Sequence, residues 1–181
     1  MLEITIPAAV DWDEANEMFV QRTKEQTLRL EHSLVSLYKW ESKWHKSFLS
    51  SKEKTDEEIL DYIKCMTLTQ GVNPEVYNHL TSDNVKEIKA YIEDPMTATT
   101  FYNAEQHRPN REVITAELIY YWMIMHQIPF ECRKWHLNQL LTLVQVCNIK
   151  NAPPKKRSKK SIANQQAALN AARRKQFNTR G

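Results

Sequence analysis

The first thirty residues alternate apolar and polar side chains, which is the pattern of half-buried strands. Leu2 to Ile6 follows this period of two, and Pro7 ends it or places it at a sheet edge. The polar stretch 11–18 is typical of a turn, and 18–23 predicts a returning strand. A third extended segment is predicted over 26–31. We therefore expect a small hairpin or three-stranded sheet at the N-terminus.

From Glu31 the spacing of apolar residues lengthens to three and four, which indicates amphipathic helices. A first helix is predicted over 31–48. Thr55, followed three residues later by Glu58, has the pattern of a capping box that begins a second helix. The apolar face of this second helix is expected to comprise Ile59, Tyr62, Ile63 and Met66.

Two more helix starts follow. Asn73 before Pro74 predicts one or two helical turns, because a proline at the first helical position loses no needed hydrogen bond. Ser82 is the expected N-cap of a helix over 82–94, with Val85, Ile88 and Ile92 as its apolar stripe. The stretch 96–111 is irregular, and a short strand and a loop are both compatible with it.

The segment from Thr115 to Met125 is apolar on nearly every face, which predicts a helix at the centre of a bundle. After Pro129, a single long core helix is expected over 130–149. The fold class is thus mainly α, a bundle of about five or six helices with a small N-terminal sheet. The domain spans 1–149 and the tail 150–181. The predicted core is Leu34, Leu37, Ile59, Ile63, Ile88, Ile119, Trp122, Met123, Leu140 and Val144.

The composition argues against nucleotide-binding loops, membrane spans, a secretory signal and disulfides. Only two glycines occur, so a glycine-rich phosphate loop or dinucleotide fingerprint cannot be written on this chain. No stretch has the length and apolarity of a membrane span, and the first residues lack the pattern of a secretory signal. The three cysteines are unpaired by spacing, which is typical of reduced thiols in a cytoplasm.

Candidate catalytic and metal-binding residues are few. Cys132 and His136 have the i, i+4 spacing of a shared metal site, but no further ligands complete the set, so a structural role is favoured. Glu117 stands among apolar residues, where an acid is either paired, with Arg111 or Lys134, or functional through a raised pKa. Pairing is the favoured alternative. We expect no enzyme activity, no cofactor and no metal.

Aromatic residues flanked by lysines form the candidate partner-binding face. Trp40 and Trp44 alternate with Lys39 and Lys43 on the first predicted helix. Core packing is the default interpretation of such a stripe, and a binding face is the alternative, because tryptophan is enriched in both.

Charge separates the tail from the rest of the chain. Residues 1–147 hold fifteen basic and twenty-two acidic residues, a formal charge of −7, whereas residues 148–181 hold ten basic residues and no acidic one. The basic side chains of interest are Lys155, Lys156, Arg157, Lys159, Lys160, Arg173, Arg174 and Lys175. Such a tail is expected to be disordered or conditionally helical, and to bind phosphates or an acidic protein surface, that of another copy included.

Three segments carry a resemblance to known proteins: 113–151, 23–49 and 95–101. Over nearly its whole length the chain resembles a family from tailed phages and prophages of Firmicutes-type hosts. Its layout is similar to the tail assembly chaperones of long-tailed phages. The resemblance implies a protein of the host cytoplasm that binds the helical tape-measure protein and keeps it soluble until the tail subunits polymerise.

Two alternatives stay open beside the chaperone. One is a phage accessory protein for nucleic-acid binding or packaging that acts through the basic tail, and weak, non-specific nucleic-acid binding follows from the charge in any case. The other is a structural head–tail or tail-completion component.

Overall fold

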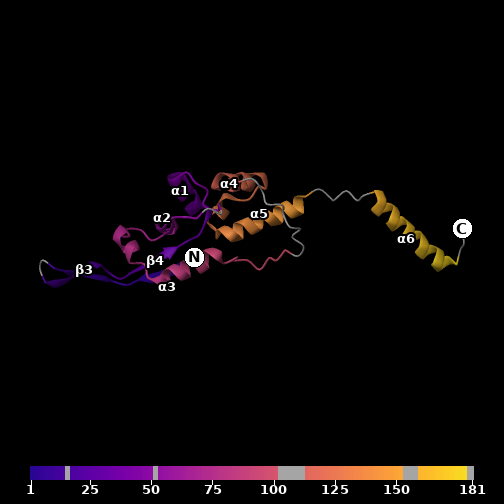
Figure 1. Ribbon diagram of the computed structural model, residues 1–181. Helices are drawn as coiled ribbons and strands as arrows, with labels where there is room; N and C mark the ends of the chain where they lie inside the picture. The colour runs from indigo at the N-terminus through magenta and orange to yellow at the C-terminus, as the bar shows by residue number, and fades with distance from the viewer. Residues whose placement is uncertain (15–16, 51–52, 102–112, 153–158, 179–181) are drawn as a thin grey trace. The chain divides into compact units, whose positions relative to one another are not determined.

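A computed structural model of the chain describes residues 1–14, 17–50, 53–101, 113–152 and 159–178 (Figure 1). The chain divides into two compact units, Met1–Cys147 and Asn148–Gly181, and each is described by itself. Helices dominate the described residues, whose strands all lie within the first thirty positions. The predicted mainly α fold with a small N-terminal β region is confirmed.

The N-terminal strands form one nested antiparallel ribbon. β1 (Leu2–Ile6) pairs with β4 (Gln26–Leu30), and within that hairpin β2 (Ala9–Asp13) pairs with β3 (Met18–Thr23). The alternation in the outer pair places four side chains in the core, namely Ile4, Ile6, Leu28 and Leu30. The predicted hairpin is therefore present. The predicted turn over 11–18 is wrong at its start, because residues 11–13 belong to β2.

Local capping chemistry begins the first two helices. Ser33 caps α1 (Leu34–Trp44), and Ser36 completes the reciprocal capping box. α2 (Asp56–Met66) begins at the predicted Thr55–Glu58 capping box, which is confirmed. Of the predicted α2 face, Tyr62, Ile63 and Met66 are buried, but Ile59 is 43% exposed, so its assignment to the core is wrong. Leu60, the next residue, is partly buried and packs against the core in its place.

The next two helical segments follow their start signals with one shift. Asn73 caps the 3₁₀ helix η1 (Pro74–His79), as predicted. α3 (Ser82–Glu93) is capped by Thr81 instead of Ser82, because the Thr81 hydroxyl and the Asn84 side chain satisfy each other's backbone N–H groups. Val85 is exposed, so the α3 stripe is narrower than predicted. No strand occurs over 96–101, and the rest of the irregular stretch lies outside the described residues.

The single long helix predicted over 130–149 is instead two helices with a break between them. α4 (Ala116–Met125) is followed by the 3₁₀ helix η2 (Phe130–Lys134) and then by α5 (Leu137–Asn151). The backbone at 136–137 leaves the helical path because the Leu137 N–H donates to the His32 carbonyl (2.7 Å), beside a β-bridge between Ser33 and His136. α6 (Lys159–Phe177) lies in the second unit.

Two hydrophobic clusters make up the core of the first unit. The first joins the outer ribbon to α2, η1 and α3, and the second joins α4, η2 and α5. α1 belongs to both, because Trp40 lies in the first cluster while Leu34 and Leu37 lie in the second. The buried residues that were predicted correctly are Leu34, Leu37, Ile63, Ile88, Ile119, Met123, Leu140 and Val144.

α4 is not enclosed on all sides, which corrects the prediction that it lies at the centre. Ala116, Ile119 and Met123 form one buried face, and Trp122 is only half-buried at its edge. The remaining face meets solvent, because the neighbouring elements cover α4 from one side. Within the described part of the chain, no helix has both the length and the apolarity needed to cross a membrane.

Two isoleucines of α4 test this one-sided burial. Ile119→Ala should lower the free energy of unfolding by about 2–5 kcal/mol, because it opens a cavity in a packed core. Ile124→Ala, on the same helix but 60% exposed, should change it by no more than about 0.5 kcal/mol. Urea unfolding of both variants measures the difference, and similar losses in the two would contradict the burial pattern.

Candidate interaction surfaces

Trp40, the first residue of the predicted partner-binding face, lies inside the protein. Its side chain is 1% exposed, and its indole Nε1–H donates to the Glu58 carbonyl (2.8 Å). The ring stacks on Trp44 and meets Phe48 edge-on. An enclosed indole with its only donor satisfied cannot reach a partner, so the assignment of Trp40 to a binding face is wrong.

Trp44 and its flanking lysines link α1 to α2. Trp44 is half-buried, and its Nε1–H donates to Asp61 Oδ2 (2.9 Å). The Lys43 ammonium pairs with the other oxygen of the same carboxylate, and the Lys46 ammonium pairs with Glu58. Lys39 is exposed. The predicted face is thus largely occupied by contacts within the chain, and its lysines neutralise acids of α2.

A different apolar surface is open to solvent on α4 and η2. Tyr121, Ile124 and Met125 are 54%, 60% and 61% exposed, and Phe130 of η2 is 52% exposed. Three- and four-residue spacing places the three α4 residues on one helical face. We call this surface the α4 face and define it by Tyr38, Tyr120, Tyr121, Ile124, Met125 and Phe130.

Aromatic contacts make the α4 face continuous. The Tyr120 ring lies 6.2 Å from the ring of Tyr38 on α1 and 6.5 Å from the ring of Phe130. Tyr120 also precedes Ile124 by one helical turn, which connects this aromatic row to the exposed residues of α4. The surface therefore spans three elements, α1, α4 and η2.

The sequence signal for this surface was the absence of a polar side on α4. Glu117 is the one charged residue among its ten. Such a helix is either enclosed on all sides or carries an exposed apolar face. Pattern alone does not distinguish these two states. Tyr121, Ile124, Met125 and Phe130 were therefore missed as candidate site residues.

The buried acid beside α4 is Glu41, not Glu117. Glu117 is exposed, and its predicted partner Arg111 lies outside the described residues. Glu41 Oε2 accepts from the Ala116 N–H (2.7 Å) at the start of α4, and Oε1 accepts from the Phe48 N–H (2.8 Å). Burial raises the pKa of Glu41, against the effect of these hydrogen bonds. The carboxylate serves to fix the N-terminus of α4 to α1.

Glu41 also lines a polar depression of about 410 Å³ between α1 and the start of α4. Its other walls include His45, Lys46 and Glu117. Among the described residues, no three histidine, cysteine or acidic side chains gather closely enough to hold a metal ion. The depression is adjacent to the α4 face and adds charged groups to its border.

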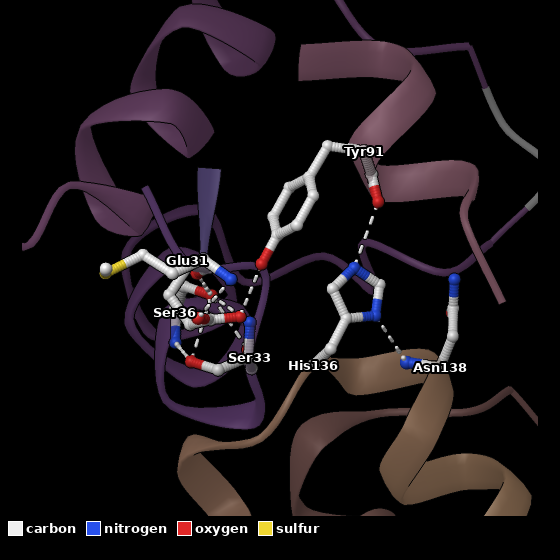
Figure 2. A network of polar contacts seen from close by, with 7 residues as sticks. Glu31, Ser33, Ser36, Tyr91, His136 and Asn138 are labelled. Atoms are coloured by element: carbon white, nitrogen blue, oxygen red, sulfur yellow. Dashed lines mark hydrogen bonds and ion pairs between the residues drawn. The ribbon is translucent and has the colours of Figure 1, made fainter. Parts of the chain in front are cut away.

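Cys132 and His136 do not share a helical face, because Cys132 lies in η2 and His136 precedes α5. His136 uses both ring nitrogens. Nε2 donates to the Tyr91 carbonyl (3.0 Å), and Nδ1 accepts from the Asn138 N–H (3.3 Å), which fixes the tautomer (Figure 2). The thiols of the three cysteines are free of disulfides. The geometry agrees with the structural role favoured for this pair.

His136 belongs to a buried polar seam that joins four segments. Tyr91 of α3 donates its hydroxyl to Glu31 Oε1 (2.7 Å), directly after β4 (Figure 2). The His32 ring lies 5.1 Å from the His136 ring, and His32 Nδ1 lies 2.6 Å from the Tyr62 hydroxyl of α2. These contacts hold β4, α2, α3 and α5 around the start of α1.

A second exposed aromatic surface lies on the inner ribbon, β2 and β3, which we call the arm. Trp12 and Phe19 are paired across the two strands, with ring centroids 4.9 Å apart. They are 52% and 72% exposed, and Val10, on the same face as Trp12, is exposed as well. In Figure 1 the arm extends from the outer ribbon away from the helices of its unit.

In the described part of the basic tail, α6 follows the end of α5. The first turn of α6 includes Lys159 and Lys160. Outside the described residues lie Lys155, Lys156 and Arg157. Arg173, Arg174 and Lys175 are exposed near the end of α6, as are Leu169 and Phe177.

Comparison of the chain with protein-family models, with curated proteins and with solved structures gives no match. The functional argument therefore rests on the residues and surfaces described above.

The buried seam generates a prediction for pH dependence. Burial, together with repulsion from His136, lowers the pKa of His32 from 6.5 to about 4. The fold thus favours neutral His32, whose contribution to stability is complete above its unfolded pKa of about 6.5 and is lost as the pH falls through about 4. The loss over this window should be on the order of 3 kcal/mol.

Urea unfolding between pH 7 and 4 should therefore show a steeper loss of stability for the native protein than for His32→Gln. The difference between the two slopes removes the contributions of groups that both proteins share. Glu41 is one of these, and its raised pKa makes stability increase as the pH falls. Equal slopes would contradict a neutral, buried His32.

Proposed function

We propose that this protein is a non-enzymatic tail assembly chaperone of a long-tailed phage, acting in the host cytoplasm, and that the α4 face binds helical segments of the tape-measure protein. The single observation that supports this proposal is the continuous exposed apolar surface of α4 and η2. A helix of a monomeric protein normally turns polar residues to solvent, and large exposed apolar patches mark interaction sites.

The chemistry of the α4 face suits an amphipathic helix. Tyr121, Ile124 and Met125 offer apolar contacts at helical spacing, which complement a partner whose apolar residues recur every three or four positions. Met125 adapts to differing side chains, because its thioether stem is flexible and polarizable. A chaperone that meets many successive segments of one long helical chain requires this tolerance.

The border of the α4 face is polar and carries both signs of charge. Glu117 and Glu131 supply negative charge, while Arg133 and Lys134 supply positive charge, and all four are exposed. An apolar centre with a charged rim is the usual anatomy of a reversible interface. Mixed rim charges favour a helical partner of mixed charge over a nucleic acid, whose backbone is uniformly negative.

The proposal assigns no reaction to the buried titratable groups. His32, His136 and Glu41 each make hydrogen bonds that connect elements of the fold. Their burial in these structural positions shifts their pKa values, so no substrate is needed to explain the shifts.

Co-expression with the tape-measure protein of the same phage or prophage tests the proposal. Ile124→Ser/Met125→Ser should weaken complex formation on the order of ten-fold or more, because it removes two central apolar contacts. Ile59→Ser/Val85→Ser is the matched control, since it removes two similarly exposed apolar side chains outside the α4 face. The readout is the fraction of tape-measure protein that stays soluble and co-purifies.

Equal solubilisation by the native protein and Ile124→Ser/Met125→Ser would overturn the docking site. The variant Arg173→Glu/Arg174→Glu/Lys175→Glu tests the alternative function, nucleic-acid binding through the basic tail. If that variant loses tight DNA binding at about 150 mM salt and the native protein binds no tail protein, the packaging role replaces the chaperone.

A further inference from the structure

The arm carries an apolar face that no described residue of its own unit covers. Its strands are edge strands on both sides, and an isolated two-stranded ribbon is marginal in water unless its face is covered. Val10, Trp12 and Phe19 lie on one side of the ribbon, and Trp12 and Phe19 are each more than half exposed. Their contact with each other covers only part of either ring.

Charge identifies the kind of segment that fits the arm. Residues 9–23, from the start of β2 to the end of β3, include four acidic residues, all within 11–17, and one basic residue, Arg22. Glu14 and Glu17 are exposed at the end of the arm. A partner must therefore present positive charge next to apolar side chains.

The chain itself contains a segment of that kind. α6 has no acidic residue among its nineteen, and Leu169, Arg173 and Phe177 follow one another at four-residue spacing, on one helical face. Leu169 and Phe177 are 52% and 68% exposed, so this stripe is uncovered in its own unit. Arg174 and Lys175 flank the stripe with further positive charge.

We propose that the arm of one copy of this chain binds α6 of a second copy. The stripe from Leu169 to Phe177 extends about 12 Å along the helix, and β2 extends about 13 Å from Ala9 to Asp13, so the two surfaces match in length. Leu169 and Phe177 pack against Val10, Trp12 and Phe19. Arg173, between them, stacks on an arm aromatic ring, while Arg174 and Lys175 pair with Glu14 and Glu17.

This contact joins two different surfaces, so it is heterologous. Such a contact generates a reciprocal dimer, a ring or a chain of copies according to its geometry. The interaction is independent of the α4 face, which stays open in each copy for a helical partner. A multimer would then present several α4 faces together and raise the effective concentration of binding sites along one tape-measure chain.

A charge-swap experiment with full-length protein tests the contact. Glu14→Lys/Glu17→Lys reverses the arm, and Arg173→Glu/Arg174→Glu/Lys175→Glu reverses α6. At low salt, the native protein should show a mass above the 21.4 kDa of one chain by light scattering coupled to gel filtration. Each variant alone should elute as a monomer, because like charges then face each other.

An equimolar mixture of the two variants should regain the larger mass, since the reversed arm of one meets the reversed helix of the other. Glu87→Lys/Glu93→Lys, on exposed positions of α3, is the control and should associate like the native protein. Trp12→Ser/Phe19→Ser should also be monomeric, and its unchanged circular dichroism would exclude a general loss of fold.

Monomeric native protein, native-like association of Glu14→Lys/Glu17→Lys, or a mixture that stays monomeric would each overturn the proposal. So would a mass that collapses after nuclease treatment, which would show bridging by nucleic acid. None of these results depends on tape-measure binding, so this inference and the proposed function can fail separately.

Discussion

Burial of α1 from two sides is the constraint on which the rest of the unit depends. Trp40 turns into the cluster under the ribbon, while Leu34 and Leu37 turn into the cluster beneath α4. Glu41, on the same helix, holds the first N–H of α4. The polar seam of His32, His136, Tyr91 and Glu31 closes the start of α1. α4 packs against this helix with one face and leaves the opposite face exposed.

That arrangement explains where an interaction surface is available. The aromatic stripe of α1 is used up by the fold, since its tryptophans pack and donate to Glu58 and Asp61. By contrast, Tyr121 of α4 and Phe130 of η2 are more than half exposed, as are the two arm aromatics Trp12 and Phe19. Apolar side chains that do not pack around α1 remain exposed on the α4 face and on the arm. The proposed chaperone role uses the α4 face, and the proposed self-association uses the arm.

Local signals in the sequence predicted most elements, and tertiary contacts decided the rest. The Thr55–Glu58 capping box and the Asn73–Pro74 start were recognisable because neighbouring residues alone satisfy them. The break between η2 and α5 was not, because it depends on a hydrogen bond to His32, more than a hundred residues earlier. Exposure of Ile59 and Ile124 was also hidden, since periodicity shows which residues share a face but not which face is covered.

The sequence revealed the apolar character of the candidate site but not its exposure to solvent. An apolar helix with one charged residue indicated either core or interface, and the choice required knowing how many elements surround α4. Glu117, which was expected among apolar residues, is exposed for the same reason. The phase of each helix, set by packing on α1, placed Glu117 in solvent and Glu41 against the α4 N-terminus.

Hydrogen–deuterium exchange of the protein with and without its tape-measure partner tests the central claim most directly. The account predicts slower exchange over α4 and η2 in the complex, because a docked helix shields them, with little change over the Trp44–Lys43 side of α1. Protection confined to α1 and α2, or to α6, with α4 unchanged, would contradict the assignment of the α4 face as the binding surface.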